Sequence, residues 1–254
     1  MLRVPLRSFI LVTPLLGGCG ADASNRVPLA VFAASSLTEA FTELESTFER
    51  AHPGLDVQLT FAGSHVLRLQ IEQGAAADVF ASADPLQMAA LRGAGRLDSD
   101  TVFARNELVV VVPSDNPARI ERFEHLSNAT RIVLGSAAVP AGRYADAVLD
   151  RSDDEFAATV RAHVVSRENN VRLVRAKVEL GEADAALVYR TDAIHARSIR
   201  AVRVPRDVAV PVELPIGVLS DAPHLEAGRR FSDHVLSALG QAVLADHGFK
   251  TEAR

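Results

Sequence analysis

The sequence lacks several features that would point to other classes of protein. Its single cysteine, Cys19, excludes a disulfide within the chain, so the fold must be stabilised by its core. No segment reaches the roughly 18 consecutive apolar residues of a membrane span, and we expect none in the mature chain. Lys and Arg form no block, and the net charge of −5 argues against a nucleic-acid partner, whose phosphates need neutralising cations.

The motifs of common enzyme classes are also missing. There is no G-x-S-x-G turn, no H-E-x-x-H zinc pair, no G-x-x-x-x-G-K-[ST] loop and, with one cysteine, no C-x-x-C. We therefore expect no enzyme, no cofactor and no side chains that bind a metal cation. The remaining catalytic hypothesis is a hydrolase that uses Ser64 with His65. Adjacent residues usually point in different directions and no orienting acid is evident, so this hypothesis is weak.

The first residues have the pattern of a targeting segment. Arg3 and Arg7 precede an apolar run at residues 9–16, and Leu-Gly-Gly then precedes Cys19. Small residues before a lone cysteine are typical of a bacterial lipoprotein cleavage site, which predicts a signal peptide over residues 1–18 and an acyl anchor on Cys19. An ordinary secretory signal is the alternative. Both interpretations predict export to the periplasm or cell envelope, with membrane attachment only through a lipid anchor.

Strand-like and helix-like segments alternate along the rest of the chain. Apolar runs predict strands at residues 28–33, 55–61, 79–82, 108–112, 131–135, 185–189 and 212–219. Helical spacing and start signals predict helices that begin near residues 36, 64, 85, 141 and 170, and helical structure over residues 223–247. The first helix start has the S-x-x-E pattern of a capping box at Ser36. This order predicts an α/β fold of two similar lobes, each with a mainly parallel sheet flanked by helices.

Neutral loop-to-helix junctions are the candidate functional segments. They lie at residues 35–36, 62–64, 139–142 and 169–171. Ligands of open α/β sheets bind beyond the carboxyl ends of the strands, where such helix starts converge. Each start offers unpaired N–H groups and a partial positive charge, so the junctions suit an anion without any Lys or Arg. Each junction also has a purely structural interpretation as a helix cap or helix start.

Six stretches of the chain together resemble the periplasmic molybdate-binding protein family of ABC importers. They are VFAASSLT (31–38), FAGS (61–64), QIEQGA (70–75), ADVFASAD (77–84), VPAGRYA (139–145) and LVYRTDA (187–193). The resemblance implies a two-lobed periplasmic-binding-protein fold with the ligand in the interlobe cleft. Lobe 1 would comprise residues 28–107 and 213–254, and lobe 2 residues 108–212. The implied partners are molybdate or tungstate and a membrane permease, with the protein itself a monomer.

The resemblance also implies which groups contact the oxyanion. Ser36 and Ser64 would each donate a hydroxyl and a backbone N–H, Ala141 and Val171 a backbone N–H, and Tyr189 its phenol hydroxyl.

The chain departs from the family pattern at two places. His65 stands where hydroxyl residues are frequent, which places the edge of the pocket in question, and Asn169-Asn170 replaces an acidic pair. Two alternatives stay open: a receptor for sulfate or another tetrahedral oxyanion, and the effector-sensing half of a transcription regulator. The export signal and the lack of a DNA-binding helix pair argue against the regulator.

Overall fold

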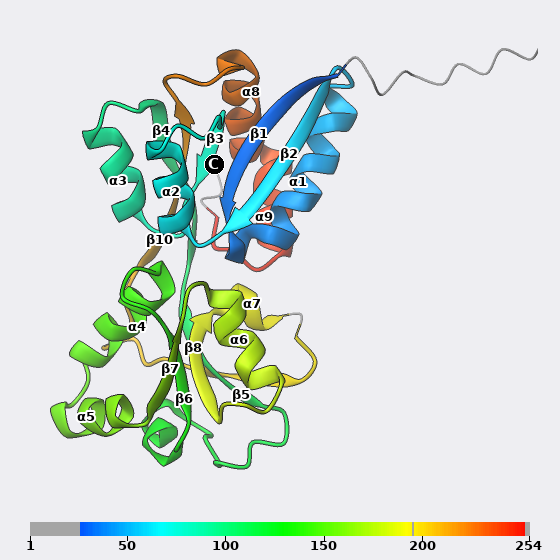
Figure 1. Cartoon of the computed structure of the whole chain (residues 1–254). Helices are drawn as coiled ribbons and strands as arrows, with labels where there is room; N and C mark the ends of the chain where they lie inside the picture. Colours follow the sequence, from blue (N-terminus) through cyan, green and yellow to red (C-terminus); the bar gives the residue numbers. More distant parts are fainter. Residues whose placement is uncertain (1–25, 195, 252–254) are drawn as a thin grey trace, which may run out of the picture.

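The structure is a computed structural model that describes residues 26–194 and 196–251. The expected signal peptide at residues 1–18 and the expected lipidation site Cys19 lie outside the described residues. The described chain forms two α/β lobes, stacked one above the other in Figure 1. Each lobe has a five-stranded sheet flanked by helices, as expected from the alternating pattern.

The sheet of lobe 1 has the strand order β2-β1-β3-β10-β4. Its strands are β1 (Val27–Ala34), β2 (Leu55–Ala62), β3 (Val79–Ala81), β4 (Leu97–Asn106) and β10 (Val212–Leu219). Strand β1 pairs in parallel with β2 and β3, whereas β10 is antiparallel to β3 and β4. The sheet is therefore mixed, because the strand that returns from lobe 2 enters it in the opposite direction.

Successive residues of a strand point to opposite faces of the sheet. The strands carry apolar residues on both faces, so helices cover both. Its helices are α1 (Thr38–Ala51), α2 (Ser64–Glu72), α3 (Pro85–Gly93), α8 (Leu225–Leu236) and α9 (Ala238–Asp246). Phe41 and Phe48 of α1 pack against Phe231 of α8 on one face, and α2 and α3 pack around Phe80 on the other. The helical stretch expected at residues 223–247 is two helices, separated at Ser237, whose side chain caps α9.

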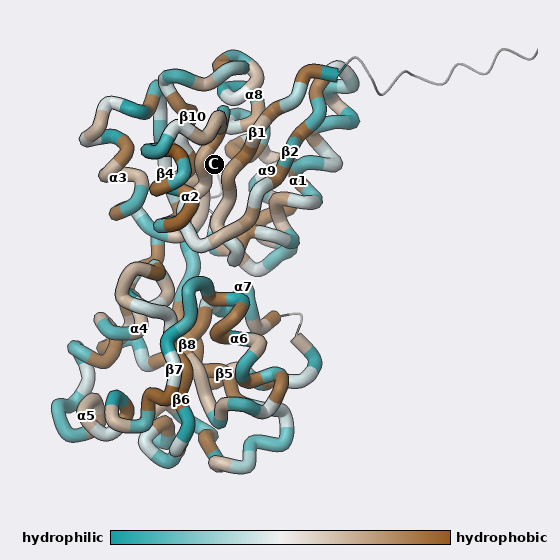
Figure 2. The backbone as a smooth tube through the Cα atoms, viewed as in Figure 1, coloured by the Kyte–Doolittle hydropathy of each residue, from teal (hydrophilic) through white to brown (hydrophobic). Residues whose placement is uncertain are grey.

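The sheet of lobe 2 has the order β7-β6-β8-β5-β9. Its strands are β5 (Leu108–Pro113), β6 (Ile132–Gly135), β7 (Val164–Glu168), β8 (Ala185–Tyr189) and β9 (Ile199–Arg203). Its helices are α4 (Pro140–Asp150), α5 (Asp154–Ala162), α6 (Val171–Glu179) and α7 (Arg190–Ile194). Strands β7, β6 and β8 are parallel, and β5 is antiparallel to both β8 and β9. The interior strands β5, β6 and β8 are buried along almost their whole length, whereas Figure 2 shows polar and apolar residues alternating along the helices.

The chain passes between the lobes twice without a flexible tether. Strand β4 ends at Asn106 and β5 begins at Leu108, and the return runs from β9 into β10. Nearly continuous strands at the first crossing suit a hinge that lets two rigid lobes rotate. No helix within the described ranges is long and apolar enough to cross a membrane.

The register of the parallel strands brings their carboxyl ends together. Ala34 of β1 pairs with Ala62 of β2, and Ala33 pairs with Ala81 of β3, so the three strands end level. The segments that follow them, including the short 3-10 turn η2 (Ser35–Leu37), therefore lie side by side on the surface of lobe 1 that faces lobe 2.

Candidate functional site

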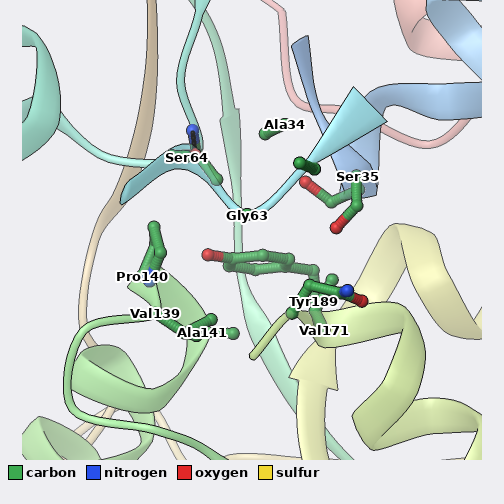
Figure 3. Close-up of a pocket in the computed structure, with 13 residues that line it drawn as sticks. Ala34, Ser35, Gly63, Ser64, Val139, Pro140, Ala141, Val171 and Tyr189 are labelled. Atoms are coloured by element: carbon green, nitrogen blue, oxygen red, sulfur yellow. Dashed lines mark hydrogen bonds between the residues drawn. The ribbon is translucent and has the colours of Figure 1, made fainter. Parts of the chain in front are cut away.

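A small cavity lies between the lobes, where the carboxyl ends of their strands meet (Figure 3). Its lining residues are Ala34, Ser35, Ser36, Ala62, Gly63, Ser64, Ala83, Val139, Pro140, Ala141, Asn170, Val171 and Tyr189. The five site residues expected from the sequence are all among them. The cavity is small, with about 10 Å³ of free space, which is roughly what one water molecule needs.

Ser36 lies in η2, directly after β1, and its side chain does not cap a helix. The capping-box interpretation is wrong, because α1 begins at Thr38 and its N-cap residue, Leu37, makes no side-chain hydrogen bond. The Ser36 hydroxyl is instead buried and has no hydrogen-bond partner among the described residues. Burying a hydroxyl without a partner is costly, and because Ser36 lines the cavity this hydroxyl is available to donate to a ligand there.

Ser64 is the first residue of α2 and follows Gly63 at the end of β2. Its Oγ accepts a hydrogen bond of 3.0 Å from the backbone N–H of Ala83. This bond uses an acceptor position of the hydroxyl and leaves its proton available to donate. The N–H of Ser64 has no partner within its own helix, because it belongs to the first turn.

Two helix starts of lobe 2 complete the backbone donors. Ala141 is the second residue of α4, after Pro140, and Val171 is the first residue of α6. The Asn170 side chain accepts a 3.0 Å hydrogen bond from the N–H of Leu173, so it caps α6 and leaves the N–H of Val171 without a partner in the helix. The side chain of Asn170 thus caps α6, so asparagine in place of the acidic residue of the family pattern is compatible with this helix start.

Tyr189, at the end of β8, contributes a buried phenol. Its hydroxyl has no hydrogen-bond partner among the described residues, and in Figure 3 this end of the ring lies between Ser64 and Pro140. Burial raises the pKa of Tyr189 well above its usual value, and Tyr144, with its ring 6.4 Å away, also raises it. The phenol therefore remains protonated and can donate a hydrogen bond to a ligand.

The cavity is electrically neutral in its own side chains. None of its thirteen lining residues is charged, and no cluster of three or more potential metal-ligating side chains occurs in the described residues. What faces the cavity is a set of O–H and N–H donors at three helix starts and η2, whose dipoles add positive potential. Such an arrangement suits a small anion that accepts hydrogen bonds in every direction.

His65 lies outside the lining of the cavity. Its pKa is lowered by burial and by the positive charges of Arg143 and Arg68, which favours the neutral ring. No hydrogen bond joins the Ser64 and His65 side chains in the described part of the chain, so the geometry offers no support for the hydrolase hypothesis.

Two ion pairs across the cleft were not anticipated from the sequence. Arg172 of α6 pairs with Glu39 of α1, and Arg143 of α4 pairs with Asp84, the N-cap residue of α3. The partners are far apart in the chain, and only the stacking of the lobes brings them together. The only sequence feature that pointed to these residues was their location, since Arg143 and Asp84 both lie in stretches that resemble the family.

Comparison with known proteins shows similarity over almost the whole chain. The family model of the bacterial extracellular solute-binding proteins matches residues 29–250. The molybdate-binding protein ModA of Mycobacterium tuberculosis is 36% identical over 260 aligned residues, which cover 98% of this chain and 97% of that protein.

Two solved structures share the fold. The periplasmic molybdate-binding protein of Azotobacter vinelandii has a TM-score of 0.76 at 20% identity and covers 89% of this chain and 100% of its own. The sulfate-binding protein SubI of Mycobacterium tuberculosis has a TM-score of 0.81 at 18% identity, with coverage of 89% and 88%. At these identities the two structures confirm the two-lobed fold and nothing finer.

Proposed function

Because this chain belongs to the bacterial extracellular solute-binding protein family, whose members bind solutes and are not enzymes, we propose that it captures molybdate or tungstate for an ABC-type importer. The observation that supports this most directly is that the buried Ser36 and Tyr189 hydroxyls have no partner in the described part of the chain and lie at a cavity without charged lining residues. The relatives named for molybdate support the choice among anions.

The proposed ligand contacts are seven neutral donors from five residues. They are the hydroxyl and N–H of Ser36, the same two groups of Ser64, the N–H groups of Ala141 and Val171, and the phenol of Tyr189. Hydrogen bonds to a charged acceptor contribute about 1.5–3 kcal/mol each. Several of them together, after the cost of desolvating a dianion, suffice for a Kd between about 1 μM and 1 nM, or about 8–12 kcal/mol.

A cavity made of donors also selects by protonation. A fully deprotonated tetrahedral anion accepts at every oxygen, whereas hydrogen phosphate carries a proton that finds no acceptor. An unmet buried polar group costs about 1–3 kcal/mol, so phosphate should bind more weakly than molybdate. Sulfate is the second candidate, because it too is fully deprotonated and differs from molybdate chiefly in size.

Calorimetric titration of the mature protein with molybdate, tungstate, sulfate and phosphate tests this proposal. We expect sub-micromolar binding of molybdate and tungstate and much weaker binding of the other two. A preference for sulfate would replace molybdate as the ligand, and no binding of any of the four would refute the oxyanion receptor.

Lobe closure and export complete the proposal. An anion held by donors from both lobes would favour the closed form, which a permease could recognise, and small-angle scattering should show compaction on adding saturating molybdate. We further propose that Cys19 is acylated after removal of residues 1–18. Intact mass of the membrane-extracted protein and of its Cys19→Ala variant tests the anchor, since only the former should carry the added acyl mass.

A further inference from the structure

Two ion pairs that join the lobes beside the cavity, among the described residues, have the same polarity. In each pair lobe 2 supplies the arginine and lobe 1 supplies the carboxylate: Arg172 with Glu39, and Arg143 with Asp84. Their positions follow from the site, because Arg172 directly follows Val171 and Arg143 lies two residues after Ala141. The cations of lobe 2 are therefore attached to the helix starts that present its anion donors.

The Arg172–Glu39 pair is bidentate and partly open to solvent. Arg172 donates from Nη1 and Nη2 to the two carboxylate oxygens of Glu39, at 2.9 and 2.7 Å. Burial alone would raise the pKa of Glu39, but the hydrogen bonds and charge of Arg172 outweigh it, and the pKa is lowered. Arg172 also reaches the backbone oxygen of Ser35 at 3.5 Å, so the pair closes the cleft beside η2.

The Arg143–Asp84 pair lies beside Ser64 and is more buried than the Arg172–Glu39 pair. The side chain of Asp84 is 4% exposed, and one of its oxygens also accepts the N–H of Gln87 at 3.1 Å. Arg143 donates to the carbonyl of Ala138 in its own lobe. One pair thus lies beside Ser36 and the other beside Ser64, on either side of the ligand cavity.

Opening of the cleft would leave these four charges without partners. Among residues 26–194 and 196–251, each of the two arginines has an ion pair only with its carboxylate across the cleft. The neighbouring Arg175 is already paired with Glu179 of its own helix. Lobe 2 would then present two unpaired guanidinium groups next to Ala141, Val171 and Tyr189, while lobe 1 would present two carboxylates next to Ser36 and Ser64.

We propose that the anion docks first on lobe 2, and that closure then transfers both arginines to the carboxylates of lobe 1. This inference rests on the proposed oxyanion function. In the open form Arg172 and Arg143 attract the dianion towards the donors of lobe 2, whereas Glu39 and Asp84 repel it from those of lobe 1. In the closed form the arginines are neutralised by their partners and the anion is held by uncharged donors alone.

Asp192 is a buried carboxyl group of lobe 2 that interacts with Arg175, Arg172 and Glu39, and Arg175 also donates to its backbone oxygen at 3.0 Å. It is fully buried, it lowers the net positive charge near Arg172, and burial raises its pKa to about 7. At neutral pH it is therefore only partly ionised and offsets the arginine only in part. The electrostatic preference for lobe 2 should accordingly be stronger at pH 6 than at pH 8.

Stopped-flow kinetics of molybdate binding test the order of docking. The chain has two tyrosines and no tryptophan. Tyr189 lines the cavity and the Tyr144 ring lies 6.4 Å from it, so tyrosine fluorescence reports on the site. We expect Arg172→Gln to slow association by roughly three- to tenfold at low salt. Glu39→Gln should leave association unchanged or faster and should speed dissociation several-fold, because it weakens only the closed form.

The donors of the two lobes should divide in the same way. Tyr189→Phe removes a donor of lobe 2 and should slow association, whereas Ser36→Ala and Ser64→Ala remove donors of lobe 1 and should act mainly on dissociation. Added salt should reduce the wild-type association rate and erase most of its difference from Arg172→Gln, because the attraction is screened beyond about 10 Å at 0.1 M salt.

Two matched controls separate local charge from net charge. Arg200→Gln breaks the Arg200–Glu121 pair within lobe 2, and Asp98→Asn breaks the Asp98–Arg229 pair within lobe 1. Both should behave as wild type in binding kinetics. Equal slowing of association by Glu39→Gln and Arg172→Gln, or by the controls, would overturn the docking order while leaving oxyanion binding intact. Failure of the wild type to bind any of the four oxyanions would instead refute the proposed function itself.

Discussion

Replacement of Gly63 by alanine should weaken ligand binding without weakening the fold. A Cβ atom at position 63 would lie 2.7 Å from the backbone oxygen of Asn169, which belongs to the opposite lobe, and 2.9 Å from Cε1 of His65. The His65 side chain can move, but a backbone oxygen at the start of α6 cannot do so without shifting the helix. The conflict with Asn169 exists only when the lobes are closed.

The size of the effect follows from the cost of overpacking. Forcing an extra methyl group into a packed contact costs about 1–3 kcal/mol, so the Kd for molybdate should rise roughly 5- to 150-fold. Gly63 has φ −63° and ψ 135°, an extended conformation that alanine adopts freely. The unliganded protein should therefore be unchanged or stabilised by about 0.4–1 kcal/mol, because alanine has less conformational freedom in the unfolded chain.

Calorimetry for affinity and thermal melting without ligand measure these opposite effects. Gly54→Ala is the matched control, since no atom lies within 4 Å of a Cβ at that position, and it should leave affinity unchanged. Undiminished affinity of Gly63→Ala would show that the lobes do not close to this contact. A lower melting temperature of its unliganded form would place the conflict within lobe 1 instead.

Three further predictions concern the donors, a buried carboxyl group and the close packing of lobe 2. Ser36→Ala, Ser64→Ala and Tyr189→Phe should each weaken molybdate binding in calorimetry by about 1–3 kcal/mol, and unchanged affinity in all three would remove these hydroxyls from the site. Burial raises the pKa of Asp192 to about 7 from an unfolded value of about 3.9. The folded state therefore binds more protons, and the free energy of unfolding should fall as pH rises between about 4 and 7. In urea unfolding, the Asp192→Asn variant should lose this pH dependence and be more stable than wild type at pH 8. Gly142→Ala should destabilise the protein by more than about 3 kcal/mol in urea unfolding, because its Cβ would lie 2.2 Å from a backbone oxygen within the same lobe; a small loss would show that this loop yields easily.

The strands that the sequence pattern did not predict all lie at sheet edges. They are β4 (Leu97–Asn106), β7 (Val164–Glu168) and β9 (Ile199–Arg203). Edge strands are half solvated and carry charged residues, as the sequence IRAVR of β9 illustrates. The interior strands are covered on both faces, so they form continuous apolar runs that can be recognised without any structure.

The site residues could be predicted better than the edge strands, because they lie directly after the ends of strands that the pattern identifies. Ser64 and Val171 are the first residues of helices that follow parallel strands, and such ends meet at one edge of each sheet. The hydrogen-bond partner of each hydroxyl could not be predicted from the local sequence pattern. The Ser36 hydroxyl matched a capping box, yet the turn η2 precedes the helix, and within residues 26–194 and 196–251 that hydroxyl has no backbone partner.

The net negative charge of the protein does not conflict with an anionic ligand once the positions of the charges are considered. The net charge of −5 is a sum over the whole chain, and the screening length of about 8 Å at physiological salt limits the effect of distant charges on the cleft. Nearer the ligand, the carboxylates of Glu39 and Asp84 are each opposed by an arginine. The potential inside the closed cavity is then set mainly by helix starts and hydroxyl protons, which cannot be titrated away at working pH. A site built from arginines would bind phosphate as well, since its charge attracts any anion, whereas neutral donors admit only an anion that needs no acceptor in return.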